Sequence, residues 1–203
     1  MFTWKPIYGE IAARLKEYQA DSSPLVEMMA EMRQQGLKSS PCMDRDDSGN
    51  QFQLEEIDPF SFLANFNRPV TTANRQAVLE FLRERWDLQS PVPEDFAGLP
   101  VVDLRKSWFM PFKFRRSSEH VTTLWNFYLH CHGAERVDEL DTDAFDACTA
   151  LRNVGLTYLT MGMFWTRPDL WVSLDWKNID HAKNLGVEMG RPNNGAEYLQ
   201  WLK

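Results

Sequence analysis

Apolar residues at helical spacing recur along this chain in short segments, each bounded by a capping side chain, a proline or a glycine. In the first segment Ile7, Ile11 and Leu15 fall on one stripe, as one face of a helix requires. In the second, Pro24 stands in the first turn and Gly36 follows the last apolar residue. These boundaries predict several short helices. Helix starts are predicted at Ser22 or Ser23, Asp58-Pro59, Thr71 or Thr72, Ser117 or Ser118, Thr142, Asp175 and Ala196.

Signals for β-strands are weaker and fall mainly in the second half of the chain. Residues 37–53 are polar and contain the turn sequence Asp47-Ser48-Gly49-Asn50, which predicts a loop. Residues 101–114 are predicted to form one or two short strands broken at Pro111. Residues 156–165 and 170–174 are predicted to form a β-hairpin around a turn at 166–169. The expected fold class is α+β, helix-dominated, with a small antiparallel sheet or hairpin in the second half.

The proline-rich stretch between residues 88 and 100 divides the chain. Its prolines and glycine, at 91, 93, 98 and 100, favour a linker or a loop pinned across the surface. A chain of 203 residues is at the upper edge of one ordinary domain. We expect a single domain over residues 1–203. The alternative is two subdomains, a helical one over 1–87 and an α+β one over 101–203, joined by the linker 88–100.

Net charge and cysteine content indicate which kinds of partner and which cellular compartment to expect. The formal net charge of −7 argues against a protein that coats nucleic acid by bulk charge, although it is compatible with a local basic face. Cys42, Cys131 and Cys148 show no Cys-x-x-Cys spacing, which is typical of reduced thiols. The sequence has no signal-peptide pattern at its start and no apolar run near the roughly 20 residues that span a bilayer. We therefore expect a cytoplasmic protein with no membrane partner.

Two acidic motifs resemble metal sites, but their surroundings disfavour a metal. Asp44, Asp46 and Glu55 follow the ligand spacing of an EF-hand calcium loop, yet prolines close on either side oppose the two flanking helices. Asp169 and Asp175-x-Lys177 are similar to the metal-binding signature of restriction-type nucleases. An extended strand between these two aspartates separates them by about 20 Å, too far to share one metal.

No catalytic group emerges from the other motifs. In His130-Cys131-His132 the two histidines are two residues apart, so on a helix they point to different faces. The sequence contains neither a phosphate-binding glycine loop nor a Gly-x-Ser-x-Gly elbow. We expect a chain that is not an enzyme and that has no catalytic residue, no metal and no cofactor.

Residues 105–116 combine positive charge with aromatic rings. Five basic residues and no acid lie in this segment, interleaved with Trp108, Phe109, Phe112 and Phe114. Basic side chains reach phosphates and aromatic faces stack on unpaired bases, so the segment predicts a nucleic-acid-binding site. One alternative stays open, in which the aromatic residues enter the core of a half-buried strand and the charges are merely solvated. The candidate binding residues are Arg105, Lys106, Trp108, Lys113, Arg115 and Arg116.

Several further motifs form a pattern over nearly the whole chain. They are Trp4 and Tyr8, Asp58-Pro59-Phe60-Ser61-Phe62, Phe66-Asn67-Arg68, Thr72-x-Asn74-Arg75, Pro93-x-Asp95-Phe96-x-Gly98-Leu99-Pro100, Thr160-Met161-Gly162-Met163-Phe164-Trp165, Arg167-Pro168 and Leu174-Asp175. This pattern resembles the N-terminal region of bacterial McrB-like AAA-family ATPases, the 5-methylcytosine-specific restriction type. Its motifs are mostly core aromatics and turn residues, so they are moderately specific.

The resemblance implies a function that the residues alone do not give. According to the resemblance, the chain is the N-terminal recognition domain of a restriction or phage-defence system. It would bind the DNA target, which is modified or unmodified. Its partners are then an AAA motor domain in the same full-length chain and a nuclease subunit. Weaker candidate contacts are Asn67, Arg68, Asn74 and Arg75, which alternatively cap and brace the turn between two helices.

A protein-interaction role is the competing hypothesis. The net charge of −7 and the acidic residues between positions 135 and 146 suit an adaptor or sensor that couples the motor to a nuclease or a phage partner. Steep loss of DNA affinity with salt distinguishes the two hypotheses, because phosphate contacts are salt-dependent.

Overall fold

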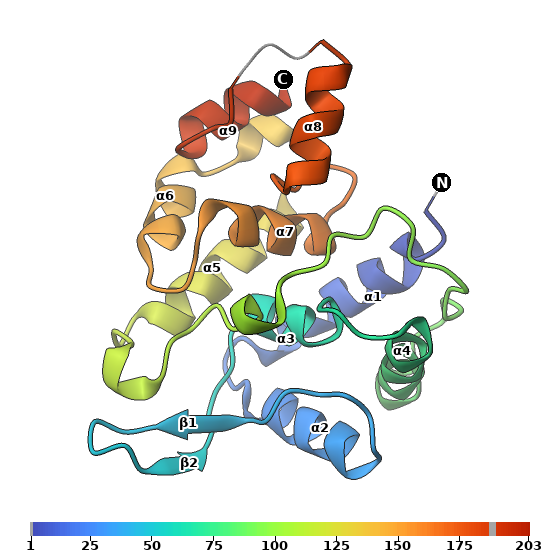
Figure 1. The fold of residues 1–203 in the computed structure, drawn as a ribbon, viewed down its shortest axis with the longest axis vertical. Coiled ribbons are helices and arrows are strands. Elements are labelled where there is room, and N and C mark those ends of the chain that lie inside the picture. The colour runs from blue at the N-terminus through green and yellow to red at the C-terminus, as the bar shows by residue number, and fades with distance from the viewer. Residues whose placement is uncertain (1, 187–189) are drawn as a thin grey trace.

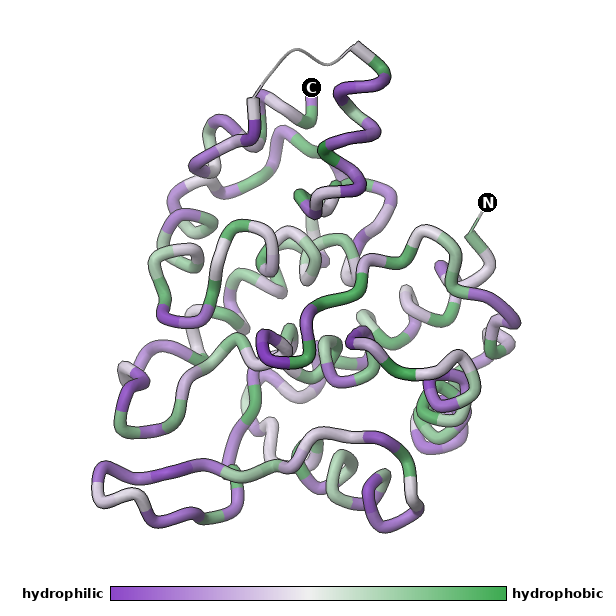
Figure 2. The backbone as a smooth tube through the Cα atoms, viewed as in Figure 1, coloured by the Kyte–Doolittle hydropathy of each residue, from purple (hydrophilic) through white to green (hydrophobic). Residues whose placement is uncertain are grey.

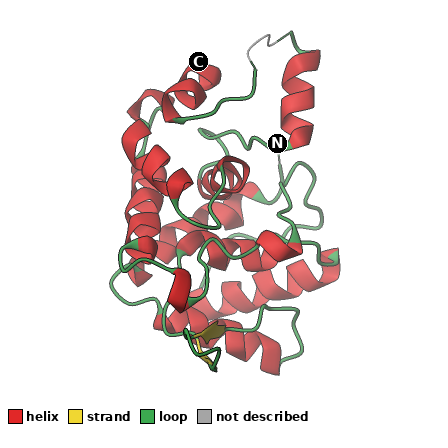
Figure 3. Cartoon of the chain, turned by 60° about the vertical axis from the view of Figure 1, so that its left-hand side comes forward, coloured by secondary structure: helices red, strands yellow, loops and turns green. Residues whose placement is uncertain are grey.

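The apolar stripes fold into helices that pack around one continuous core (Figure 1). The computed structural model describes residues 2–186 and 190–203. Helices dominate in both halves of the described chain, and one small antiparallel sheet accompanies them, which confirms the predicted helix-dominated α+β class (Figure 3). The elements are α1 (Lys5–Leu15), α2 (Ser23–Gln34), β1 (Met43–Arg45), β2 (Gln51–Gln53), α3 (Pro59–Phe66), α4 (Thr72–Trp86), α5 (His120–Gly133), α6 (Thr142–Ala150), α7 (Leu156–Thr166), α8 (Trp176–Asn184) and α9 (Gly195–Leu202).

Three of the predicted helix starts have the expected side-chain cap. Asp58 precedes α3 and its carboxylate accepts a hydrogen bond from the Ser61 backbone N–H at 2.9 Å. Thr71 caps α4, and Asp175 caps α8, in the same way. The predicted cap of α5 at Ser117 or Ser118 is wrong. That helix begins at His120, and the residue before it makes no side-chain capping bond.

The β-hairpin predicted over residues 156–174 is wrong. Residues 156–166 form the helix α7, and its last eight residues are all buried. A short run that is apolar on every side fits a buried strand and a buried helix equally well, so periodicity alone cannot separate them. Packing on three sides, against α1, α3 and α5, favours the helix here.

The sheet lies in the first half of the chain, inside the segment predicted as a loop. Strands β1 and β2 pair antiparallel, with Met43 opposite Gln53 and Arg45 opposite Gln51. The tube is largely hydrophilic along this hairpin (Figure 2). Polar strands of three residues lack the alternation that marks a half-buried strand, which explains why the sequence signal was only that of a turn.

The strands predicted over residues 101–114 are also absent. The segment instead forms irregular chain with two short 3-10 turns, η2 (Leu104–Lys106) and η3 (Lys113–Arg115). Two other such turns are η1 (Lys16–Tyr18) and η4 (Val137–Glu139). Pro111 has no N–H for a ladder, and the segment is tied to its neighbours by side chains.

The proline-rich stretch 88–100 is held against the N-terminal helix. The Trp4 indole N–H donates to the Ala97 carbonyl at 2.9 Å. The Glu10 carboxylate accepts hydrogen bonds from the backbone N–H groups of Gln89 and Ser90. The core on either side is shared, because α1 packs against α7 and α3 packs against α5.

None of the described helices is both long enough and apolar enough to cross a membrane.

We predict that Gly162→Ala destabilises the fold. A methyl group at this position would overlap the buried ring of Phe60, so the core must shift. Overpacking of this kind costs about 1–3 kcal/mol of unfolding free energy, measurable by urea denaturation. The matched control is Gly9→Ala in α1, where no atom lies near the added methyl group. That variant should be as stable as the wild type or more so, and equal losses in both variants would contradict close packing at Gly162.

Candidate nucleic-acid interface

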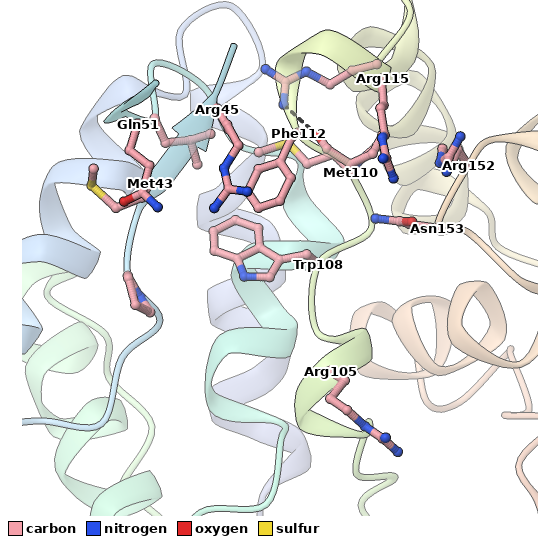
Figure 4. A pocket seen from close by; sticks show the side chains of 14 residues that line it. Met43, Arg45, Gln51, Arg105, Trp108, Met110, Phe112, Arg115, Arg152 and Asn153 are labelled. Atoms are coloured by element: carbon pink, nitrogen blue, oxygen red, sulfur yellow. Dashed lines mark hydrogen bonds between the residues drawn. The ribbon is translucent and has the colours of Figure 1, made fainter. Parts of the chain in front are cut away.

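A hollow of about 590 Å³ opens where three parts of the chain meet (Figure 4). One wall is the β1–β2 hairpin, the second is the segment 105–116, and the third is the turn between α6 and α7. We call this hollow the arginine pocket. Its lining residues are Pro41, Met43, Arg45, Gln51, Leu54, Arg105, Trp108, Met110, Pro111, Phe112, Arg115, Arg116, Arg152 and Asn153.

The arginine pocket is positively charged in a chain that is negative overall. Five of its lining residues are arginines and none is an aspartate or a glutamate. The formal net charge of the whole chain is −7. A hollow lined by one sign of charge attracts ligands of the opposite sign, whatever the total charge of the protein. The arrangement therefore suits an anionic ligand.

Arg45 and two aromatic rings gather at one end of the pocket. The Arg45 guanidinium lies over the Phe112 ring, 5.0 Å from its centroid, and the Trp108 ring lies beside them (Figure 4). The Arg45 Nε is buried and has no hydrogen-bond partner among the described residues. Trp108 is half-buried, so part of its ring faces the hollow.

A buried carboxylate from the hairpin holds the basic segment in place. Asp44, only 2% exposed, accepts a hydrogen bond from the Lys113 backbone N–H at 2.7 Å and forms an ion pair with Arg116 at 3.0 Å. Arg116 is itself 7% exposed and also donates to the Pro111 carbonyl. These contacts join β1 to the 111–116 loop. Arg116 therefore has a mainly structural role, since its charge is already paired with a carboxylate.

The other predicted residues divide between the pocket and its surroundings. The structure brings Arg105 and Arg115 to the lining, together with Trp108 and Arg116, and leaves Lys106 and Lys113 outside it. Arg105 pairs with Asp103 at 3.2 Å. Lys113 reaches Glu55 at 3.0 Å.

Arg115 is the predicted residue that lines the pocket and has no ion-pair partner among the described residues. Its guanidinium lies over the Phe114 ring at 4.9 Å, and no ion pair of Arg115 occurs within residues 2–186 and 190–203. Lys106 likewise has no carboxylate partner in the described part of the chain, but it is exposed away from the lining.

The aromatic residues of the segment follow neither prediction completely. Phe109 is fully buried and packs on Phe60, as the core interpretation requires. Phe112 and Phe114 are exposed and stack on each other, with ring centroids 6.4 Å apart. Exposed aromatic rings beside arginines are available for stacking on a ligand.

Sequence reasoning missed the residues that come from outside the segment. Arg45 and Gln51 belong to the hairpin, and Arg152 and Asn153 lie in the turn after α6. Asn153 adopts φ of 71°, the left-handed conformation in which asparagine is favoured. No sequence motif links these positions, because only the tertiary packing brings them together.

Three of the four weaker candidates, Asn67, Asn74 and Arg75, make structural hydrogen bonds around the turn between α3 and α4. Arg75 is buried and donates to the Phe66 and Arg68 carbonyls. Asn67 accepts from the Tyr8 hydroxyl at 2.5 Å, and Asn74 accepts from the Lys38 backbone N–H. Bracing was the alternative kept open for these residues.

The two acidic motifs that resemble metal sites, and two of the cysteines, have structural explanations. The Asp46 carboxylate binds Asn50 within the hairpin turn, and Asp169 pairs with Arg167. Residues 2–186 and 190–203 contain no group of three His, Cys, Asp or Glu residues that could hold a metal ion. Burial raises the pKa of the Cys42 thiol to about 11 and that of Cys148 to about 12, so both stay protonated at neutral pH.

Comparison with known proteins gives a family but no described relative. A family model described as "Domain of unknown function (DUF8425)" matches residues 4–203. No curated protein and no solved structure matches the chain.

We predict that Asp44→Ala strongly destabilises the protein. The substitution removes the buried partner of Arg116, which keeps only its longer ion pair with Glu56 at 3.6 Å, and it removes the acceptor of the Lys113 backbone N–H. Breaking a buried ion pair in this way costs roughly 3–5 kcal/mol of unfolding free energy. Urea denaturation measures this loss. Glu55→Ala is the matched control, since it removes an exposed ion pair between the same hairpin and the same loop, and its unfolding midpoint should not change. If both variants unfold at the wild-type urea concentration, Asp44 does not hold the basic segment.

Proposed function

Since the chain belongs to the family of this domain of unknown function (DUF8425), we propose from its own surface that it is a nucleic-acid-binding recognition module. The observation that carries the proposal is the arginine pocket, whose lining holds five arginines and two accessible aromatic rings. Three of these arginines, Arg45, Arg115 and Arg152, have no ion-pair partner among the described residues.

The pocket chemistry matches the two parts of a nucleotide. Guanidinium groups bind phosphate oxygens bidentately and remain charged at every physiological pH. The Trp108 and Phe112 rings offer flat faces on which a base can stack. A volume of about 590 Å³ is within the range of small-molecule sites. A stacked duplex hides its base faces, so the pocket suits an unpaired or extruded base.

The proposed role is binding without catalysis at this site. The lining contains no aspartate, glutamate, histidine, cysteine, serine, threonine, lysine or tyrosine. The usual general acids, general bases and nucleophiles are therefore missing from the pocket walls.

The resemblance to McrB-like ATPases extends the proposal, because it implies that the chain works in a restriction system. In that setting the ligand is DNA, with or without a modified cytosine. The chain is then the target-recognition domain, and an AAA motor in the same full-length chain and a nuclease subunit act after it. This extension depends on the resemblance, whereas nucleic-acid binding depends on the pocket.

A protein-adaptor role is the second candidate, favoured by a different surface. Trp176 is 75% exposed and Leu185 is 70% exposed, at the two ends of α8. Large exposed apolar side chains are typical of contact surfaces. Near η4 the side chains of Glu135 and Glu139 add negative charge, since neither forms an ion pair within the described residues.

We predict saturable, salt-dependent binding of short DNA single strands to the purified chain, followed by fluorescence anisotropy. Each phosphate contact contributes about −0.7 to the slope of log affinity against log salt concentration for a single strand. Replacing Arg115 and Arg152 by alanine should therefore make the slope shallower by about 1.4. A control that replaces the exposed Lys16 and Lys177 changes net charge equally and should keep the wild-type slope. Absence of binding at low salt would favour the adaptor role.

We predict that Trp108→Ala weakens binding of the same strands by roughly 5- to 150-fold, the effect of losing one stacked base. Trp176→Ala removes an exposed tryptophan outside the pocket and should bind as the wild type does. Plain and cytosine-modified duplexes, tested alongside, show whether the pocket prefers a modification. Equal affinities for Trp108→Ala and the wild type would remove Trp108 from the binding site.

A further inference from the structure

We propose that the arginine pocket is one half of a strand-binding groove, and that a phosphate subsite around Arg68 is the other half. The two halves share Trp108 and Pro41 in their linings. This inference rests on the proposed nucleic-acid binding and makes it more specific. The ligand it implies is a strand with consecutive phosphates, not a single nucleotide.

The second half is a hollow of about 540 Å³ beside Trp108. Like the arginine pocket, it has cationic side chains and no aspartate or glutamate in its lining. Hydroxyl groups of three serines lie among them. The residues that matter here are Lys38, Arg68 and Trp108, together with Ser39, Ser40 and Ser107.

Arg68 is built into this hollow with spare hydrogen-bonding capacity. It is 7% exposed, and its guanidinium donates to the Lys38 carbonyl at 2.9 Å and to the Ser40 hydroxyl. A guanidinium carries five N–H donors, so these two contacts leave three of them unused. One of the unused donors, Nε, is buried and has no partner among the described residues.

The charge of Arg68 is also uncompensated. No carboxylate within residues 2–186 and 190–203 forms an ion pair with it. Burial and the nearby Arg33 guanidinium lower the pKa of Arg68, which means that its surroundings disfavour the charged form. A buried charge of this kind is normally paired. A bound phosphate would supply the missing anion.

Arg75 fixes the backbone from which Arg68 projects. Its guanidinium donates to the Arg68 carbonyl at 3.2 Å and to the Phe66 carbonyl at 2.9 Å. The other face of Arg75 lies on the Phe96 ring, 4.8 Å from the centroid. Arg75 therefore acts as a positioning residue, and the guanidinium of Arg68 is held before a ligand arrives.

Trp108 lines both cationic hollows, and this arrangement matches the covalent structure of a nucleic-acid strand. A nucleotide inside a strand has a phosphate on each side of its sugar. With the base stacked on Trp108, one phosphate reaches the arginine pocket and the next reaches Lys38 and Arg68. A mononucleotide with one phosphate fills only one of the hollows.

The experiment compares two ligands, thymidine 5′-monophosphate and the thymidine trinucleotide, by calorimetry on the full chain. For the wild type we expect the trinucleotide to bind about tenfold tighter or more, because it gains charged hydrogen bonds at the second hollow. Lys38→Ala and Arg68→Gln should lose this gain, so that each variant binds the trinucleotide no tighter than it binds the mononucleotide. Lys16→Ala, an exposed lysine outside both hollows, should keep the gain.

The Lys38→Ala variant tests the phosphate subsite without disturbing the fold. The Lys38 side chain is exposed, and the backbone carbonyl that accepts from Arg68 stays in the variant. Trinucleotide binding that is unchanged in both Lys38→Ala and a folded Arg68→Gln would overturn the subsite while leaving the proposed function in place. No binding of either ligand to the wild type would overturn the proposed function, and the subsite with it.

Discussion

The ion pair between Asp44 and Arg116 is the interaction on which the candidate site depends. It joins a short polar hairpin to a loop that forms no regular strand, and it is buried, unlike the exposed Lys113–Glu55 pair that connects the same two parts of the chain. Burying two charges costs desolvation, so such a pair contributes more to a defined geometry than to net stability. Here the geometry includes the pocket walls, because Arg45 follows Asp44 directly and Arg115 precedes Arg116.

The core explains why this loop can be irregular without weakening the fold. Helix α7 is buried among α1, α3 and α5, so the two halves of the chain share their apolar contacts. Phe109 is the anchor that the basic segment contributes to this core, through its contact with Phe60. Other residues of the segment, Phe112 and Arg115 among them, present aromatic rings and charge to solvent.

Local signals in the sequence predicted the helices well, because a cap such as Asp58 or Asp175 acts within three residues of its own position. The strand predictions were wrong for two physical reasons. Residues 156–166 are apolar on all sides, and the strands that do form are polar and only three residues long. For the site, sequence reasoning found the contiguous part, Trp108 and Arg115 among it. Arg45 and Arg152 could not be found, since only tertiary packing brings them to the pocket.

The tip of the β1–β2 hairpin makes its hydrogen bonds within itself, through Asp46, Gly49 and Asn50. The bonds to the basic segment start at Asp44, below the tip. Residues inserted or removed at the tip would therefore change only a loop-closure entropy, which grows slowly with length. Arg45 and Gln51, which line the pocket, flank this tip. The length of the hairpin beside the pocket can thus change while the core keeps its sequence.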